Sequence, residues 1–394
     1  MKLKLSRLAV CLLALPLLGA ASVRADVPAM FRGDPRHSGA YQTRGPEQLK
    51  GVLWKFASGS PVRSTPAFAD GRLYFGNREG FFYALDAATG REVWRFKSGG
   101  PVASSPAVYK GAVSFSSVDG HLYALNTADG SLKWKLKLAD EKAERIDFDF
   151  WDYYRSSPSV DGDTLYVGST SRKVFAVDVS TGKVKWTFDT EGLVRSSPAV
   201  SAGSVYVGDF GGYLYALDAA TGKLSWKFKT EGNPTFKVGE IQSSPAVSGG
   251  AVYVGSRDYN LYALDARTGK PRWKFFDKDS WVISSPAVSG GTIYVGGSDS
   301  HGFYAVDERT GAKRWEYRAP SNVFTSPAVS GGTVYFGCGD IYRPRSPGYV
   351  FALDAGTGKD RWQFKVEGNV YSSPVVSGGV IYFGSEDGNL YALR

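Results

Sequence analysis

The sequence predicts an all-β fold, an eight-bladed β-propeller with four-stranded antiparallel blades. One observation is a segment in which a polar residue, usually the Asp of Asp-x-x-Thr-Gly, precedes a tryptophan by eight positions. It occurs seven times, starting at Asp86, Asn126, Asp178, Asp218, Asp265, Asp307 and Asp354. A second is a set of eight Ser-Pro or Thr-Pro pairs, with prolines at Pro66, Pro106, Pro158, Pro198, Pro245, Pro286, Pro327 and Pro374. A period of roughly 40 residues with strand-like runs and no helical pattern is typical of a propeller.

Each unit contains four short runs rich in Val, Tyr, Leu, Trp and Phe, which predict strands A to D. In the copy at 194–228, Ala202-Gly203 predicts the A–B hairpin, because positive φ is easy there. Asp218 and Gly222 bound the C–D turn, where the Asp side chain can accept backbone N–H bonds and the Gly takes the strained conformation.

Strand D alternates aromatic and cationic residues, as in Trp226-Lys227-Phe228. The aromatic side chains therefore share one face and bury a large apolar area, while the cations point outward and discourage pairing with another molecule. We expect one docking tryptophan in each blade: Trp54, Trp94, Trp134, Trp186, Trp226, Trp273, Trp315 and Trp362.

The two ends of the repeat array complement each other. After Pro374 the chain stops at Arg394 without a strand D, and before Pro66 the run 52–56 reads as a strand D alone. The N-terminal strand is therefore expected to complete the last blade and remove the open edges, so that residues 51–394 form a closed ring.

The first 50 residues lie outside the repeats. Residues 1–25 have a basic start, a short apolar run and small residues before Asp26, which predicts a signal peptide and a periplasmic or secreted protein. Cys11 lacks the setting of a lipidation site. Residues 26–50 form an N-terminal extension that contains Arg32-Gly33-Asp34; we expect a strap lying against the ring rather than an adhesion motif.

Composition excludes several functions. The chain has 47 basic and 38 acidic side chains without a long basic run, so nucleic acid is not an expected partner. Cys338 is the one cysteine after the signal peptide, which rules out an internal disulfide and leaves a reactive or a buried thiol open. The three histidines are spread over distant segments, and no metal site is expected.

Departures from the repeat indicate a binding face. The distance from the docking tryptophan to the next strand-A proline is 12 residues in five blades, but 24 from Trp134 to Pro158 and 19 from Trp226 to Pro245. From Pro327 to Asp354 the chain is also longer than in other blades. D–A and B–C connections share one face of an antiparallel blade, and insertions on one face usually mark the binding surface.

The candidate binding residues lie on that face: Arg63, Asp149, Trp151, Asp152, Arg155 and Arg195. Aromatic and acidic side chains of the longest insertion could recognise a protein, a sugar or a cation, or could simply cap the ring. The three arginines each precede a Ser-Ser-Pro or Ser-Thr-Pro and should reach the rim of the central channel. They could hold an anion there, or pair with carboxylates such as Asp119, Asp149 or Asp209. The serine pairs are interpreted as hydrogen-bonding groups at the strand starts, not as nucleophiles, because no base recurs beside them.

The motif Ala-x-Asp-x-x-Thr-Gly-x-x-x-Trp resembles the tryptophan-docking motif of the pyrroloquinoline-quinone (PQQ) type eight-bladed propellers, over residues 31–394. That family includes quinoprotein alcohol dehydrogenases and the BamB factor of outer-membrane assembly. The dehydrogenases imply PQQ, calcium, a catalytic Asp and often adjacent cysteines, and this chain lacks the cysteine pair. BamB implies partner docking through D–A loops, although its lipidation cysteine has no counterpart here.

The function expected from the sequence is an exported, non-enzymatic scaffold that binds a protein in the cell envelope, possibly in outer-membrane assembly. It is expected to be a monomer that does not span the membrane and needs no cofactor. The alternatives are a PQQ-dependent quinoprotein with calcium, or a sugar-binding propeller.

Overall fold

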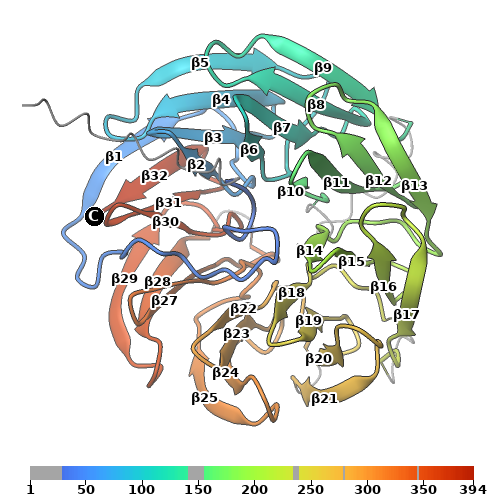
Figure 1. Cartoon of the computed structure of the whole chain (residues 1–394). Helices are drawn as coiled ribbons and strands as arrows, with labels where there is room; N and C mark the ends of the chain where they lie inside the picture. The colour runs from blue at the N-terminus through green and yellow to red at the C-terminus, as the bar shows by residue number, and fades with distance from the viewer. Residues whose placement is uncertain (1–28, 141–154, 234–238, 278–279, 344–345) are drawn as a thin grey trace, which may run out of the picture.

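Eight four-stranded antiparallel sheets stand around a central axis in the computed structural model (Figure 1). The structure describes residues 29–140, 155–233, 239–277, 280–343 and 346–394. Every described strand belongs to one of these sheets, and the predicted all-β, eight-bladed fold is confirmed.

In each blade strand A lies nearest the axis and strand D at the rim (Figure 1). The A strands are β2 (Ala67–Ala69), β6 (Ala107–Tyr109), β10 (Ser159–Asp161), β14 (Ala199–Ser201), β18 (Ala246–Ser248), β22 (Ala287–Ser289), β26 (Ala328–Ser330) and β30 (Val375–Ser377). The B strands are β3 (Arg72–Gly76), β7 (Ala112–Ser116), β11 (Thr164–Ser169), β15 (Ser204–Gly208), β19 (Ala251–Gly255), β23 (Thr292–Gly296), β27 (Thr333–Cys338) and β31 (Val380–Gly384).

The outer half of each blade is longer. The C strands are β4 (Phe81–Asp86), β8 (His121–Asn126), β12 (Lys173–Asp178), β16 (Tyr213–Asp218), β20 (Asn260–Asp265), β24 (Gly302–Asp307), β28 (Gly348–Asp354) and β32 (Asn389–Leu393). The D strands are β5 (Glu92–Lys97), β9 (Leu132–Lys137), β13 (Val184–Asp189), β17 (Leu224–Lys229), β21 (Pro271–Phe276), β25 (Lys313–Arg318), β29 (Asp360–Val366) and β1 (Val52–Ala57).

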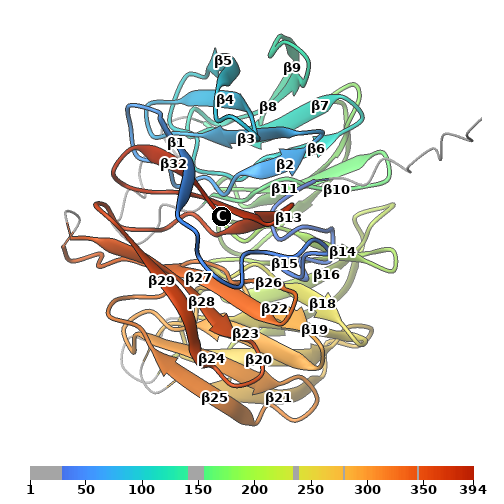
Figure 2. The ribbon, with the colours of Figure 1, turned by 90° about the vertical axis from the view of Figure 1, so that its left-hand side faces the viewer.

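The N-terminal strand closes the ring, as predicted. In the last blade β1 pairs antiparallel with β32, with Trp54 opposite Ala392 and Phe56 opposite Leu390. Figure 2 shows the two strands side by side at the rim. Because β1 pairs with the outer edge of β32, strand C of the last blade is paired on both edges, as it is in every other blade.

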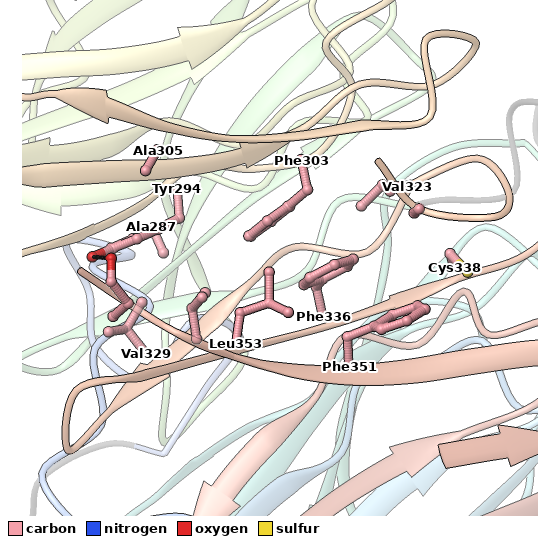
Figure 3. Close-up of a cluster of buried hydrophobic side chains, with 13 residues drawn as sticks. Ala287, Tyr294, Phe303, Ala305, Val323, Val329, Phe336, Cys338, Phe351 and Leu353 are labelled. Atoms are coloured by element: carbon pink, nitrogen blue, oxygen red, sulfur yellow. Dashed lines mark hydrogen bonds between the residues drawn. The ribbon is translucent and has the colours of Figure 1, made fainter. Parts of the chain in front are cut away.

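The hydrophobic core consists of separate layers, each packed between two adjacent blades. Between blades 6 and 7, for example, the rings of Phe303 and Phe336 stack with centroids 3.9 Å apart, and Phe336 stacks in turn on Phe351 (Figure 3). Each sheet buries both of its faces against neighbouring blades, so the B and C strands are apolar at almost every position. Only strand D alternates between exposed and partly buried side chains.

A tryptophan joins each blade to the next. Trp186 Nε1 donates to the Ala219 carbonyl oxygen at 3.0 Å, and the indole lies against Gly222 of the Thr-Gly turn. The same donation repeats around the ring. At the closing blade no C–D turn exists, because strands C and D belong to opposite ends of the chain. There Trp362 Nε1 donates instead to the Pro46 carbonyl oxygen at 2.8 Å.

Residues 29–50, here called the strap, cross one end of the channel. Inner-edge amides of Val200, Val247, Val288 and Val329 donate to strap carbonyl oxygens at 2.6–2.9 Å. The Gly379 amide of the β30–β31 hairpin donates to the Arg44 carbonyl oxygen, so the strap lies on the face of the A–B hairpins. The expectation of a strap holds for these described residues.

The strap is anchored by two buried polar side chains. Arg32 donates to the carbonyl oxygens of Pro286 and Pro327, and the His37 ring contacts Ser159 Oγ at 2.9 Å. Burial lowers the pKa of His37 to about 3, so the imidazole stays neutral. Because Arg32 is only 3 % exposed, the Arg-Gly-Asp triplet is a structural element of the strap.

Candidate functional site

The central channel contains a small cavity of about 30 Å³. Phe31 of the strap lines it, so the strap supplies part of its wall. The remaining lining consists of strand-A starts and the residues before them: Arg63, Thr65, Ala103, Ser105, Arg155, Ser157, Arg195, Ser197, Gln242, Ser244, Ile283, Ser285, Phe324 and Ser326. The site is therefore built by equivalent positions of different blades.

The cavity brings together Arg63, Arg155 and Arg195, which the sequence places in three different blades. Arg195 is 1 % and Arg155 8 % exposed, so both lie in the channel wall rather than on the outer surface. The guanidinium of Arg63 makes a two-pronged ion pair with Glu386, with Nε–Oε1 and Nη2–Oε2 distances of 2.8 Å. The other three candidates, Asp149, Trp151 and Asp152, lie outside the described residues.

Two of the carboxylates suggested as arginine partners accept hydrogen bonds from tyrosines of their own blades. Asp119 accepts a hydrogen bond from Tyr123 Oη at 2.5 Å, and Asp209 accepts one from Tyr215 Oη at 2.8 Å. The partner found for Arg63, Glu386, lies in a B–C loop of the last blade and reaches Arg63 only through ring closure.

Sequence reasoning missed Arg257, which follows β19 in a B–C loop. Its Nη2 donates to Gln242 Oε1 at 2.8 Å, and its guanidinium lies 4.7 Å from the Trp281 ring centroid and 5.1 Å from that of Phe210. The available signal was its place two residues after the Gly that ends strand B, the position that Glu386 occupies in blade 8.

The opposite part of the channel mouth is apolar. Ile283, Phe324, Ile341 and Tyr371 form one buried cluster against which Trp281 packs. Three of these occupy the repeat position that carries arginine in blades 1, 3 and 4, so the mouth has a cationic and an apolar side.

The Ser-Pro hydroxyls close a ring around the channel, here called the hydroxyl ring. In each blade the hydroxyl just before the proline accepts the amide N–H of the equivalent residue in the preceding blade, at 2.9–3.2 Å. Its members are Thr65, Ser105, Ser157, Ser197, Ser244, Ser285, Ser326 and Ser373. The hydrogen-bonding role inferred for these side chains is thus visible in the structure.

Cys338 is fully buried at the end of β27. Burial raises the pKa of its thiol to about 12, so it stays protonated at neutral pH and has little nucleophilic character. Of the two readings left open for this thiol, the structure favours the buried one. Within the described ranges, no three His, Cys, Asp or Glu side chains are grouped so that they could hold a metal ion.

Asp277, between β21 and β22, carries a carboxyl that is 1 % exposed and accepts a hydrogen bond from Tyr304 Oη at 2.6 Å. Burial raises its pKa to about 6, so folding favours the protonated form. Its contribution to stability is therefore full below the unfolded pKa near 3.8 and is lost as pH rises through 6.

We expect Asp277→Asn, which stays neutral, to be more stable than the parent protein at pH 8 by up to about 3 kcal/mol. The difference should vanish near pH 4, where the parent carboxyl is protonated. Urea unfolding of both proteins at pH 4, 6 and 8 measures it; a stability difference that does not change with pH would contradict the assignment.

Comparison with known proteins supports the fold. Residues 154–394 match the family model described as the β-propeller of the beta-alanine-activating enzyme, and residues 50–148 match that of the outer membrane protein assembly factor BamB. No curated protein matches the chain. In the described residues no helix is long and apolar enough to cross a membrane.

Solved structures of two functional classes share this architecture. BamB from Moraxella catarrhalis is 19% identical with a TM-score of 0.65, covering 87% of this chain and 97% of its own. A europium-containing methanol dehydrogenase is 15% identical with a TM-score of 0.74, covering 93% and 98%. The quinohemoprotein alcohol dehydrogenase from Comamonas testosteroni is 14% identical with a TM-score of 0.75, covering 93% and 80%.

At these identities the solved structures show a common fold and leave function open. The resemblance to PQQ-type propellers, BamB among them, is confirmed by the family models and the architecture. Since the first family model spans more than half of the sequence, this chain belongs to the β-propeller family of the beta-alanine-activating enzyme.

Proposed function

We propose that this protein is an exported docking scaffold of the cell envelope, which binds a protein partner through its insertion face. The insertion face is the side of the disc that carries the D–A and B–C connections. The observation that carries the proposal is the asymmetry of the ring: the strap covers the channel on the A–B side, while the longer connections join strand ends on the other side. A rigid frame with variable loops on one face is the usual arrangement of a binding propeller.

Tyr342 is the exposed aromatic side chain that suits such a face best. It lies in the connection between β27 and β28, is 66 % exposed, and has its hydroxyl 3.5 Å from Asp299 Oδ1. Exposed tyrosines and tryptophans often dominate binding energy at protein interfaces. Tyr342 therefore joins Trp151 as a candidate contact.

The partner we favour is a component of outer-membrane protein assembly. This rests on the match of residues 50–148 to the assembly factor model and on the predicted signal peptide. The protein would then act as a periplasmic monomer. A sugar-binding role would use the same aromatic side chains and stays an alternative.

A PQQ-dependent dehydrogenase is the second candidate, because two dehydrogenase structures superpose with TM-scores of 0.74 and 0.75. The residues that the structure describes do not fit the cofactor. The cavity of about 30 Å³ holds only a few water molecules, whereas PQQ is a tricyclic molecule. The described residues also lack a carboxylate cluster for calcium, and the chain has no adjacent cysteines. We therefore propose a function without PQQ.

Photo-crosslinking can test the docking face. A photoreactive phenylalanine analogue at Tyr342 should capture one envelope protein, identified by mass spectrometry as an assembly component. The matched control is Leu224, 44 % exposed at the start of β17 beside the opposite face, which should give no adduct. Trp151→Ala with Tyr342→Ala should weaken binding of the captured protein by at least about 2 kcal/mol. The same adduct from position 224, or none from position 342, would show that the face is wrong.

A further inference from the structure

The hydroxyl ring has unused donors. A serine hydroxyl carries one O–H donor and two acceptor lone pairs. In the hydrogen bonds of the described residues, each ring oxygen acts as an acceptor of a backbone N–H, and none donates to a protein acceptor. All eight side chains are at most 5 % exposed. Buried O–H groups need an acceptor, and seven of the eight line the channel cavity.

The charged side chains in the cavity lining are all cationic, and one of them, Arg63, is ion-paired with Glu386. Its lining includes three arginines and no carboxylate. Arg155 and Arg195 stand two positions before the ring members Ser157 and Ser197, in neighbouring blades. A guanidinium has five N–H donors, so it can serve other partners and still present positive charge to the cavity. In a water-poor interior this charge acts over several ångströms with little screening.

Size limits what can enter. A cavity of about 30 Å³ admits a few atoms, and the aromatic ring of Phe31 and the side chains of Ile283 and Phe324 border it. Organic acids of more than a few heavy atoms are too large for this space. A monatomic anion can accept several O–H and N–H bonds at once without any particular orientation.

We propose that the central channel binds a small inorganic anion of halide size, at the hydroxyl ring beside Ser157 and Ser197. The anion accepts the O–H hydrogen bonds for which the ring has no protein acceptor among the described residues, and it lies beside the guanidinium groups of Arg155 and Arg195. Because it binds the closed ring and not the unfolded chain, it stabilises the folded protein in proportion to its concentration. This site is separate from partner docking on the insertion face.

The test uses chloride and bromide as probes. Line broadening in chloride NMR reports binding to the full-length mature protein, with gluconate keeping ionic strength constant. In crystals soaked with bromide, anomalous scattering locates the ion. We expect broadening that bromide competes away and sulfate does not, and one bromide peak inside the hydroxyl ring.

Paired variants separate the site from general stability. Ser157→Ala with Ser197→Ala removes two ring hydroxyls, and we expect at least tenfold weaker chloride binding. Ser156→Ala with Ser196→Ala is the matched control. It also removes two hydroxyls that accept backbone amides, those of Gly168 and Gly208, but these two side chains do not line the cavity. The control should bind chloride like the parent protein.

Arg195→Gln is a second variant, which leaves the ring hydroxyls in place and should also lose at least tenfold in affinity. The proposal is overturned if the parent protein broadens the chloride signal no more than its denatured form does. It is equally overturned if all variants bind alike, or if the bromide peak lies outside the ring.

Discussion

Replacing β1 (Val52–Ala57) by a Gly-Ser sequence of equal length is expected to lower the free energy of unfolding by at least about 5 kcal/mol. The change removes Trp54, whose Nε1 donates to the Ala87 carbonyl oxygen at 3.0 Å, and Phe56, whose ring lies 5.3 Å from that of Tyr83. It also weakens the ladder between β1 and β32, because Gly and Ser have low strand propensity, and so favours an open edge on the last blade.

Urea unfolding followed by circular dichroism measures this loss. Lys55→Ser is the control, since that side chain lies on the exposed face of β1 and should change stability by less than about 0.5 kcal/mol. If the Gly-Ser protein unfolds at the same urea concentration as the parent, the strand does not hold the ring closed.

The second large effect concerns the glycine under each docking tryptophan. A Cβ on Gly222 would lie 2.6 Å from the Trp186 indole, and the residue has a φ of +73°. Gly222→Ala therefore has to displace the indole from the neighbouring blade, with loss of its hydrogen bond to the Ala219 carbonyl oxygen. We expect a loss of at least about 3 kcal/mol.

The same blade provides a matched control. Gly203, in the β14–β15 hairpin, has a φ of +74° but nothing within 4 Å of an added Cβ. Gly203→Ala should therefore cost only the left-handed backbone strain, about 1–2 kcal/mol. Equal losses in the two variants, measured by urea unfolding, would mean that tryptophan docking contributes little to stability.

Much of this architecture could be predicted because a repeat protein contains several copies of the same local sequence pattern. The Asp-x-x-Thr-Gly turn is an example: Asp218 Oδ1 accepts the Thr221 amide at 2.8 Å and Gly222 has positive φ, as the residue types demand. The closure by β1 followed from counting, since an incomplete last unit and a lone first strand leave one economical solution.

The candidate site was predicted less completely. The repeat position that carries Arg63, Arg155 and Arg195 does reach the channel, because equivalent positions of a ring converge on its axis. Their burial did not follow from the sequence, and neither did Arg257, since B–C loops vary and periodicity cannot say which loop side chains turn inward. The acidic and aromatic insertion residues Asp149, Trp151 and Asp152 stay predictions.

By itself the sequence determined the fold class, the number of blades, the closing strand and the face that carries the insertions, because all of these follow from the spacing of the repeated segments and from counting them. Tertiary structure alone decided what meets at the axis. Glu386 reaches Arg63, His37 reaches Ser159, and eight hydroxyls join into one ring only after closure brings distant segments together. Such contacts depend on packing across the whole ring, which no local pattern of residues encodes.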